Sequence, residues 1–179
     1  MASAFTHAAA ALALGTAFRR PGRSARFWLL GAAFAVVPDL DGIGFWLGVP
    51  YESALGHRGF SHSIVFAALL ASVGLLAFRD ASVGRARIWL FLFLATVSHG
   101  VLDAMTSGGG GVAFFAPFQN ERYFFPWRPI LVSPMSIRRF FTERGVRVLA
   151  SEMVWVWIPA AGFALIALGL RGRRLPGSR

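Results

Sequence analysis

The sequence of 179 residues contains neither cysteine nor lysine. The absence of cysteine excludes disulfide bonds, thiol chemistry and cysteine-ligated zinc, so histidine and carboxylate side chains remain as the strong metal ligands. Charged residues make up only 15% of the chain, whereas hydrophobic residues make up 56% and the mean hydropathy is +0.59. Because so few charges cannot cover a water-soluble domain of this size, the long apolar runs indicate membrane spans.

Arginine accounts for all 18 basic residues, and the formal net charge of the chain is +10. A strongly basic chain can indicate a nucleic-acid-binding protein. In this sequence, however, the arginines stand between apolar runs, where residues that set membrane topology and contact anionic lipid headgroups are found. We therefore expect membrane lipid, and no nucleic acid, as the partner of these side chains.

The apolar runs predict an all-α, polytopic membrane helical bundle with about four transmembrane helices. Helix is the expected state because an open sheet edge cannot be satisfied in lipid, and a span needs about 17–25 residues. Four runs meet or nearly meet that length: 27–48, 60–78, 88–106 and 153–170. Residues 3–18 predict a shorter helix, which we expect to be retained because no basic segment precedes it as in a secretory signal. Residues 1–179 are expected to form a single membrane-embedded domain.

The distribution of arginine predicts which ends of the helices are cytoplasmic. Segments 19–26 and 79–87 and the tail after residue 170 hold four, three and four arginines, whereas segment 49–59 holds only Arg58. By the positive-inside rule the first three are cytoplasmic, and 49–59 and 107–152 face outward. The latter region is rich in aromatic residues and has prolines at positions 117, 126, 129 and 134. Because these prolines exclude a regular spanning helix, we expect 107–152 to form an interfacial cap.

All four histidines of the chain and three of its four aspartates lie within or at the ends of the apolar runs. These residues are His7, Asp39, Asp41, His57, His62, His99 and Asp103. Ionisable groups at membrane depth are costly, which makes them functional candidates. Taken singly, such a histidine is usually a packing residue and such an aspartate a helix cap or turn residue. Seven unpaired groups together would be very costly in lipid, which favours a shared site.

Helix geometry predicts that these side chains meet in one layer. His99 and Asp103 are four residues apart, so both project from one helix face. Pro38 disturbs its helix, so the two carboxylates after it can turn toward a cavity. At 1.5 Å per residue, His7, Asp39 and His99 each lie about 18 Å from the arginine-rich end of their helices. We therefore predict that these seven residues form one metal site nearer the outer face of the membrane. Asp41 is expected either as a ligand or as an acceptor that orients an imidazole.

Histidine and carboxylate ligands without thiolate suit Zn²⁺ first, and then Mn²⁺ or Fe²⁺. Seven ligands exceed the need of one tetrahedral zinc ion, which leaves a dinuclear centre open. His99 and Asp103 also match the last motif of lipid phosphatases of the vanadium-haloperoxidase type, but the Lys-x6-Arg-Pro element of those enzymes is absent. Intramembrane histidine and aspartate also build ion paths, so a metal-ion or proton transporter is the alternative function.

These motifs resemble those of the LexA-regulated, membrane-bound metal-dependent hydrolases, the YdjM family, across residues 1–155. The resemblance rests on His7, on Pro38-Asp39-Leu40-Asp41, and on His57-Arg58-Gly59-Phe60-Ser61-His62-Ser63. It continues in His99-x-x-x-Asp103 with Thr106, in Pro117-Phe118 with Arg122, and in Ser151-Glu152. It implies a hydrolase of the inner membrane and suggests a distant likeness to the zinc-dependent phospholipase C and S1/P1 nuclease group.

The expected reaction is hydrolysis of a phosphoester or other ester of a lipid-like substrate by metal-activated water. We assign Asp41 and Glu152 as catalytic carboxylates. Arg58, Arg122 and Arg128 are predicted to bind the substrate, because a guanidinium group is a bidentate donor to phosphate.

Overall fold

The computed structural model of the chain describes residues 1–18, 25–78 and 84–172. Its α-helices are α1 (Ala4–Phe18), α2 (Ala25–Val36), α3 (Ile64–Gly74), α4 (Arg85–Ala104), α5 (Ile137–Phe140), α6 (Glu143–Glu152) and α7 (Ile158–Gly172). Three 3-10 helices, η1 (Val37–Phe45), η2 (Phe60–His62) and η3 (Leu75–Ala77), and the π-helix η4 (Met153–Trp157) adjoin them. Within the described ranges the β interactions are two isolated bridges, so the predicted all-α class is confirmed.

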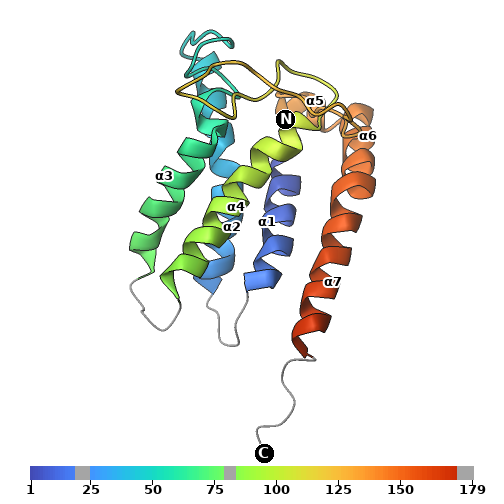
Figure 1. Ribbon diagram of the computed structural model, residues 1–179. Helices are drawn as coiled ribbons and strands as arrows, with labels where there is room; N and C mark the ends of the chain where they lie inside the picture. The colour runs from blue at the N-terminus through green and yellow to red at the C-terminus, as the bar shows by residue number, and fades with distance from the viewer. Residues whose placement is uncertain (19–24, 79–83, 173–179) are drawn as a thin grey trace, which may run out of the picture.

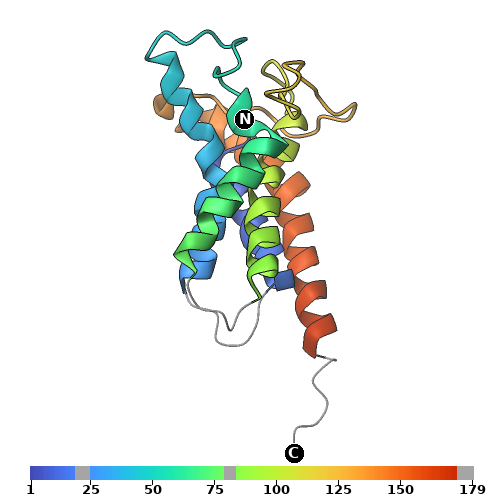
Figure 2. The ribbon, with the colours of Figure 1, turned by 60° about the vertical axis from the view of Figure 1, so that its left-hand side comes forward.

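Helices α1, α2, α3, α4 and α7 run side by side as a bundle (Figure 1, Figure 2). Helix α1 contacts α2, α4 and α7, and α4 also contacts α2 and α3. In the core, Phe27 of α2 stacks on Phe91 of α4 with the ring centroids 4.3 Å apart. A Cβ atom at Gly31 would lie only 2.3 Å from Phe91 Cζ, so glycine is what lets this ring approach α2. Small residues allow the same close approach of helices in membrane bundles generally.

Three helical stretches among the described residues are long and apolar enough to cross a membrane: Ala25–Phe45, Arg85–Ala104 and Glu143–Arg171. They correspond to three of the four predicted spans. The fourth predicted span, 60–78, is shorter than expected, because its regular helical part Ile64–Ala77 falls in the range of 10–17 residues. The first residues of that apolar run form η2 and a cap instead, in which Ser63 Oγ accepts a hydrogen bond from the Phe66 N–H at 3.0 Å.

Turns and irregular segments cover one end of the bundle. Residues 46–59 and 105–136 lie at this end, and so does the N-terminus (Figure 1, Figure 2). The region 107–152, predicted to be an irregular cap, is irregular only as far as residue 136, after which α5 and α6 follow. Helix α6 runs on through η4 into α7, so the last long helix begins ten residues earlier than the predicted 153–170 span, at Glu143. The helix can begin there because the last of the four prolines is Pro134.

The other end of the bundle is where α1 ends, α2 begins, η3 ends and α4 begins (Figure 1). The arginine-rich segments predicted to be cytoplasmic, 19–26 and 79–87, connect these helices. Most of both segments, namely residues 19–24 and 79–83, lies outside the described residues. Which side of the membrane this end faces stays a prediction from the distribution of arginine.

Candidate metal centre

The predicted histidines and aspartates come together at the covered end of the bundle, and they come from several different elements. His7 comes from α1, and His99 and Asp103 come from successive turns of α4. Pro38 stands at the start of η1, where it ends the regular α2 helix because proline has no N–H to continue the α-helical ladder. The tighter 3-10 turn that follows carries the two aspartates at 39 and 41.

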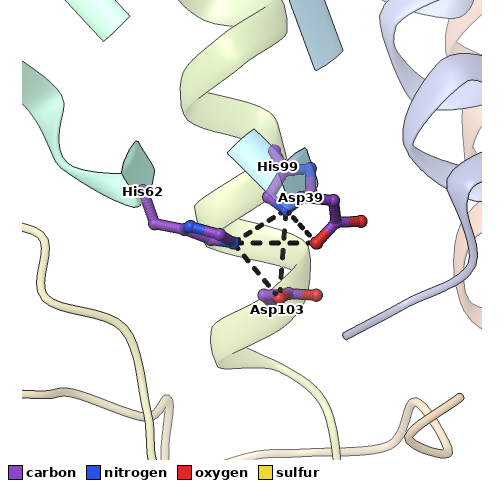
Figure 3. A group of neighbouring side chains, drawn as sticks. All are labelled: Asp39, His62, His99 and Asp103. Atoms are coloured by element: carbon purple, nitrogen blue, oxygen red, sulfur yellow. Dashed lines mark hydrogen bonds and ion pairs between the residues drawn. The ribbon is translucent and has the colours of Figure 1, made fainter. Parts of the chain in front are cut away.

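Four of these side chains form a tight group, which we call the four-ligand cluster: Asp39, His62, His99 and Asp103 (Figure 3). Each offers one ligand atom, and these atoms all lie within 4.8 Å of one another. His99 Nε2 is 3.0 Å from His62 Nε2 and 3.3 Å from Asp39 Oδ1. His62 Nε2 is 3.7 Å from Asp103 Oδ2. Ligands bonded at about 2.0–2.1 Å in a tetrahedral zinc site are about 3.3 Å apart, so this spacing is close to the one that an ion requires.

Hydrogen bonds fix the orientation of both imidazoles in the cluster. His99 Nδ1 lies 2.7 Å from the Ala35 carbonyl oxygen, which can only accept, so this nitrogen carries the proton. His62 Nδ1 lies 3.1 Å from Asp41 Oδ2, which fixes the same tautomer. In the neutral rings the two Nε2 lone pairs therefore point at each other across 3.0 Å. Such a pair needs a cation between its members, either a proton or a metal ion.

Several buried polar atoms around the cluster have no hydrogen-bond partner among the described residues. They include both carboxylate oxygens of Asp39 and both ring nitrogens of His7. The His7 ring stacks on His99 with centroids 3.7 Å apart, and its Nε2 is 3.5 Å from Asp103 Oδ1. Buried carboxylates without partners are costly. These residues therefore fit a bound divalent cation, which would supply the missing partner.

Asp41 sits beside the cluster and is already saturated with donors. Its Oδ1 lies 2.6 Å from His57 Nδ1, and its Oδ2 accepts from the Arg58 N–H at 3.0 Å and from Ser61 Oγ. Asp41, His57 and His62 also form a second group whose ligand atoms lie within 4.8 Å of one another. Because both of its oxygens already have donors, Asp41 holds the imidazoles of His57 and His62 in place, which favours the orienting role over the ligand role among the two that the sequence left open.

Arg58 is a buried counter-ion in this structure. Its Nε lies 2.9 Å from Asp103 Oδ2, and its other donors reach the Gly108 carbonyl and Thr106 Oγ1, each at 3.0 Å. Its backbone has a φ of 63°, a conformation that costs a non-glycine residue about 1–3 kcal/mol. Hydrogen bonds from its N–H to Asp41 and from the Ala113 N–H to its carbonyl stabilise this turn. The side chain is only 1% exposed and takes part in an internal ion pair, and its predicted contact with substrate stays a prediction.

The remaining predicted residues lie outside the four-ligand cluster. Arg122 donates to the carbonyl oxygens of His57 at 2.7 Å and Tyr51 at 2.6 Å, so it holds the turn before η2. Arg128 is exposed, with its guanidinium 4.6 Å from the centre of the Phe124 ring. Of Arg58, Arg122 and Arg128, Arg128 is the one whose side chain is exposed at the surface. Its contact with substrate stays a prediction.

Glu152, predicted to be catalytic, is buried but is not a member of the four-ligand cluster. Its carboxylate accepts from the Ser3 N–H at 2.5 Å, from Ser3 Oγ at 2.6 Å and from Thr6 Oγ1 at 2.8 Å. These bonds join the end of α6 to the start of α1. Thr6, one of the donors, directly precedes His7. All the described hydrogen-bond partners of Glu152 belong to α1 and the residues that precede it, and its catalytic role stays a prediction.

Sequence reasoning missed three groups that contact residues of the site: one side-chain hydroxyl and two backbone groups. Ser61 stands inside the His-Arg-Gly-Phe-Ser-His-Ser motif, so its hydroxyl could have been found from the motif. The Ala35 carbonyl, which fixes the ring of His99, leaves no signal in the sequence because every residue has such a group. The backbone N–H of Ala2, which donates to Asp103 Oδ1 at 2.7 Å, leaves no signal in the sequence for the same reason.

The bundle and its buried histidines and aspartates define a polytopic helical membrane protein with a candidate metal site. The chain belongs to the YdjM inner membrane protein family, whose model matches residues 1–174. It is 40% identical over 163 residues to the inner membrane protein YbcI of Escherichia coli K12, a match that covers 89% of this chain and 92% of the relative. The predicted family and inner-membrane localisation are thus confirmed. No solved structure matches the chain, so the likeness to the phospholipase C and S1/P1 nuclease group stays a prediction.

Proposed function

We propose that this inner-membrane protein is a metal-dependent hydrolase that acts on a phosphoester or other ester of a lipid-like substrate. The observation that carries the proposal is the four-ligand cluster, in which two buried imidazole nitrogens face each other at 3.0 Å beside carboxylates. The donor set of two histidines and two aspartates favours Zn²⁺, with Mn²⁺ or Fe²⁺ as alternatives. A divalent cation bound there supplies Lewis acidity and lowers the pKa of a coordinated water.

The residues of the chain divide the remaining tasks. Asp39, His62, His99 and Asp103 hold the cation, and Asp41 keeps the His62 ring in the binding tautomer. Arg58 offsets part of the negative charge of the carboxylates through its 2.9 Å contact with Asp103.

His7 is the residue that we assign to proton transfer or to an additional ligand position. Both of its ring nitrogens are buried without a hydrogen-bond partner, and it adjoins Asp103. The second group of Asp41, His57 and His62 is the place for a second ion if the centre is dinuclear. Against that stands the 2.6 Å contact between Asp41 and His57, which already satisfies both groups.

A metal-ion or proton transporter is supported less well by this geometry. An ion path needs ionisable groups along the whole depth of the membrane. Among the residues that the structure describes, the buried titratable side chains lie toward the covered end of the bundle. The core beyond them is apolar and includes Phe27, Phe91 and Leu92.

Two measurements on one preparation test the proposed function. Metal content of the purified protein should be high in the native chain and lost in His62→Ala and His99→Ala. Metal-loaded protein in liposomes is then assayed for hydrolysis of a phosphoester and carboxylic ester panel, and for uptake of Zn²⁺ or protons. Metal-dependent hydrolysis without uptake supports the proposal, and uptake without hydrolysis contradicts it. The matched control is Gly162→Ala on α7, where an added Cβ would have no heavy atom within 4 Å.

A further inference from the structure

A cavity of about 500 Å³ opens beside η1 and reaches the four-ligand cluster at Asp39. We call it the η1 groove. Its apolar walls include Leu40, Ile43 and Trp46 of the segment at the end of the first span, and Met135 from the segment before α5. Its volume falls within the range of about 300–1,000 Å³ found for small-molecule sites. The groove is therefore lined in part by Asp39, a residue of the cluster, whose carboxylate oxygens lie behind its wall.

The walls of the η1 groove are exposed to an unusual degree for large apolar side chains. Trp46 is 88% exposed, Leu40 is 60% exposed and Ile43 is 49% exposed. They follow directly on, or lie within, the candidate span Ala25–Phe45 of an inner-membrane protein. Tryptophan at the end of a span is typical of the boundary between acyl chains and headgroups. The mouth of the groove thus lies at the end of a candidate span, where acyl chains and headgroups meet.

The polar residues that line the groove are Asp39 of the cluster and Ser136, together with Met1 at the N-terminus. Both carboxylate oxygens of Asp39 are buried, and neither has a hydrogen-bond partner. A ligand that fills the groove must therefore be apolar along the walls and present an oxygen-rich group to the cation site beside Asp39. A soluble phosphoester has no apolar part to fill such walls, whereas a membrane lipid has both parts.

We propose that the η1 groove binds an acyl chain of a membrane glycerolipid and places the ester linkage of that lipid at the four-ligand cluster. The inference rests on the proposed hydrolase function and names its substrate class. The lipid moves sideways from the bilayer between η1 and residues 135–136, and its headgroup stays at the covered end of the bundle. Hydrolysis then breaks an ester bond, with water supplying a hydroxyl to one product and a proton to the other.

Gly42 gives a direct way to fill the groove. It lines the cavity, and an added Cβ would have no heavy atom within 4 Å. Gly42→Leu is therefore tolerated by the protein but occupies the space of the ligand. Met135→Trp narrows the groove from the opposite wall and does not alter the segment that carries the aspartates. Gly162→Leu is the matched control, because this glycine also has open space around its Cβ position but lies on α7.

The probe is a phosphatidylethanolamine with a diazirine in its acyl chain, present as a minor component of phosphatidylethanolamine vesicles that contain the protein. After irradiation, mass spectrometry measures labelling of residues 40–46 and 135–136. We expect strong labelling in the native chain and the Gly162→Leu control, and a loss of about tenfold in Gly42→Leu and Met135→Trp, equivalent to about 1.4 kcal/mol. Metal content should stay at the native value in all four proteins.

The outcomes separate this inference from the proposed function. Labelling that is unchanged in both groove variants overturns the groove, even if lipid hydrolysis is found. A dimer cross-linked through residues 40–46 also overturns it, because the occupant is then a second copy of the chain. Labelling that falls as expected, in a protein that hydrolyses no ester, supports lipid binding in the groove and contradicts the hydrolase. Because the chain contains no cysteine, a single spin-labelled cysteine in place of Ile43 gives an independent check of whether the groove is occupied by lipid.

Discussion

Replacing Asp41 by asparagine distinguishes a carboxylate that orients imidazoles from one that binds metal. In the structure its two oxygens accept from, or contact, His57, the Arg58 N–H, Ser61 and His62. Asparagine has the same shape but only one acceptor oxygen, and its NH₂ group donates hydrogen bonds instead of accepting them. The His62 ring then loses the contact that fixes its tautomer.

The expected magnitude follows from the position of Asp41 behind the ligands. Loss of a carboxylate that orients a metal-bound histidine typically weakens metal binding by about 10–100-fold, or about 1.4–2.8 kcal/mol. Asp39→Asn should be far more harmful, because Asp39 belongs to the four-ligand cluster. The number of ions bound at saturating Zn²⁺ should be the same in Asp41→Asn as in the native chain.

The assay is a competition titration of Zn²⁺ against a fluorescent chelator in detergent, with the ion count measured by elemental mass spectrometry. Ser72→Ala is a suitable control, because this exposed hydroxyl lies on α3 and bonds to the Ala68 carbonyl and Trp89. An unchanged affinity in Asp41→Asn would refute the orienting role. A fall from two bound ions to one would show that Asp41 is itself a ligand of a second metal.

Two further predictions follow from buried contacts. Arg58→Gln removes the buried partner of Asp103 and should destabilise the metal-free protein by about 3–5 kcal/mol. The loss of stability should be smaller with Zn²⁺ bound. Equal losses in thermal unfolding with and without the ion would contradict the proposed charge balance. Gly31→Ala drives a Cβ into the Phe91 ring, so we expect a loss of about 1–3 kcal/mol from overpacking. Gly162→Ala, with open space at its Cβ, should unfold at the native temperature or slightly above, because alanine has the higher helix propensity. A similar loss in both variants would contradict the packing explanation for Gly31.

The sequence by itself determined the class of protein and the depth of its polar residues. Low charge with long apolar runs is sufficient for a helical membrane bundle, because charged side chains and unpaired backbone groups are both costly in lipid. The rise per residue is a local property of a helix, so the common depth of His7, Asp39 and His99 could be worked out before the helices were assembled. His62 and His99, from different helices, lie together as that argument predicted.

The hydrophobic pattern was less informative about the residue at which a helix begins. The 60–78 run looked long enough to span, but its first residues form η2 and the Ser63 cap. The hydrophobic pattern is the same for a helix and for a capped turn followed by a helix. The difference comes from side-chain hydrogen bonds, which hydropathy does not measure.

Tertiary structure alone decided which partner each charged side chain takes. Arg58, Arg122 and Glu152 looked available for chemistry, yet they bond to Asp103, to the carbonyls of the 51–57 turn and to Ser3 and Thr6. Asp39 and Asp41 are two residues apart but face different partners, because the 3-10 turn after Pro38 sends them in different directions. Depth along a helix is set by the residues of that helix. Direction and partner are set by helices distant in sequence, which become neighbours only when the bundle packs.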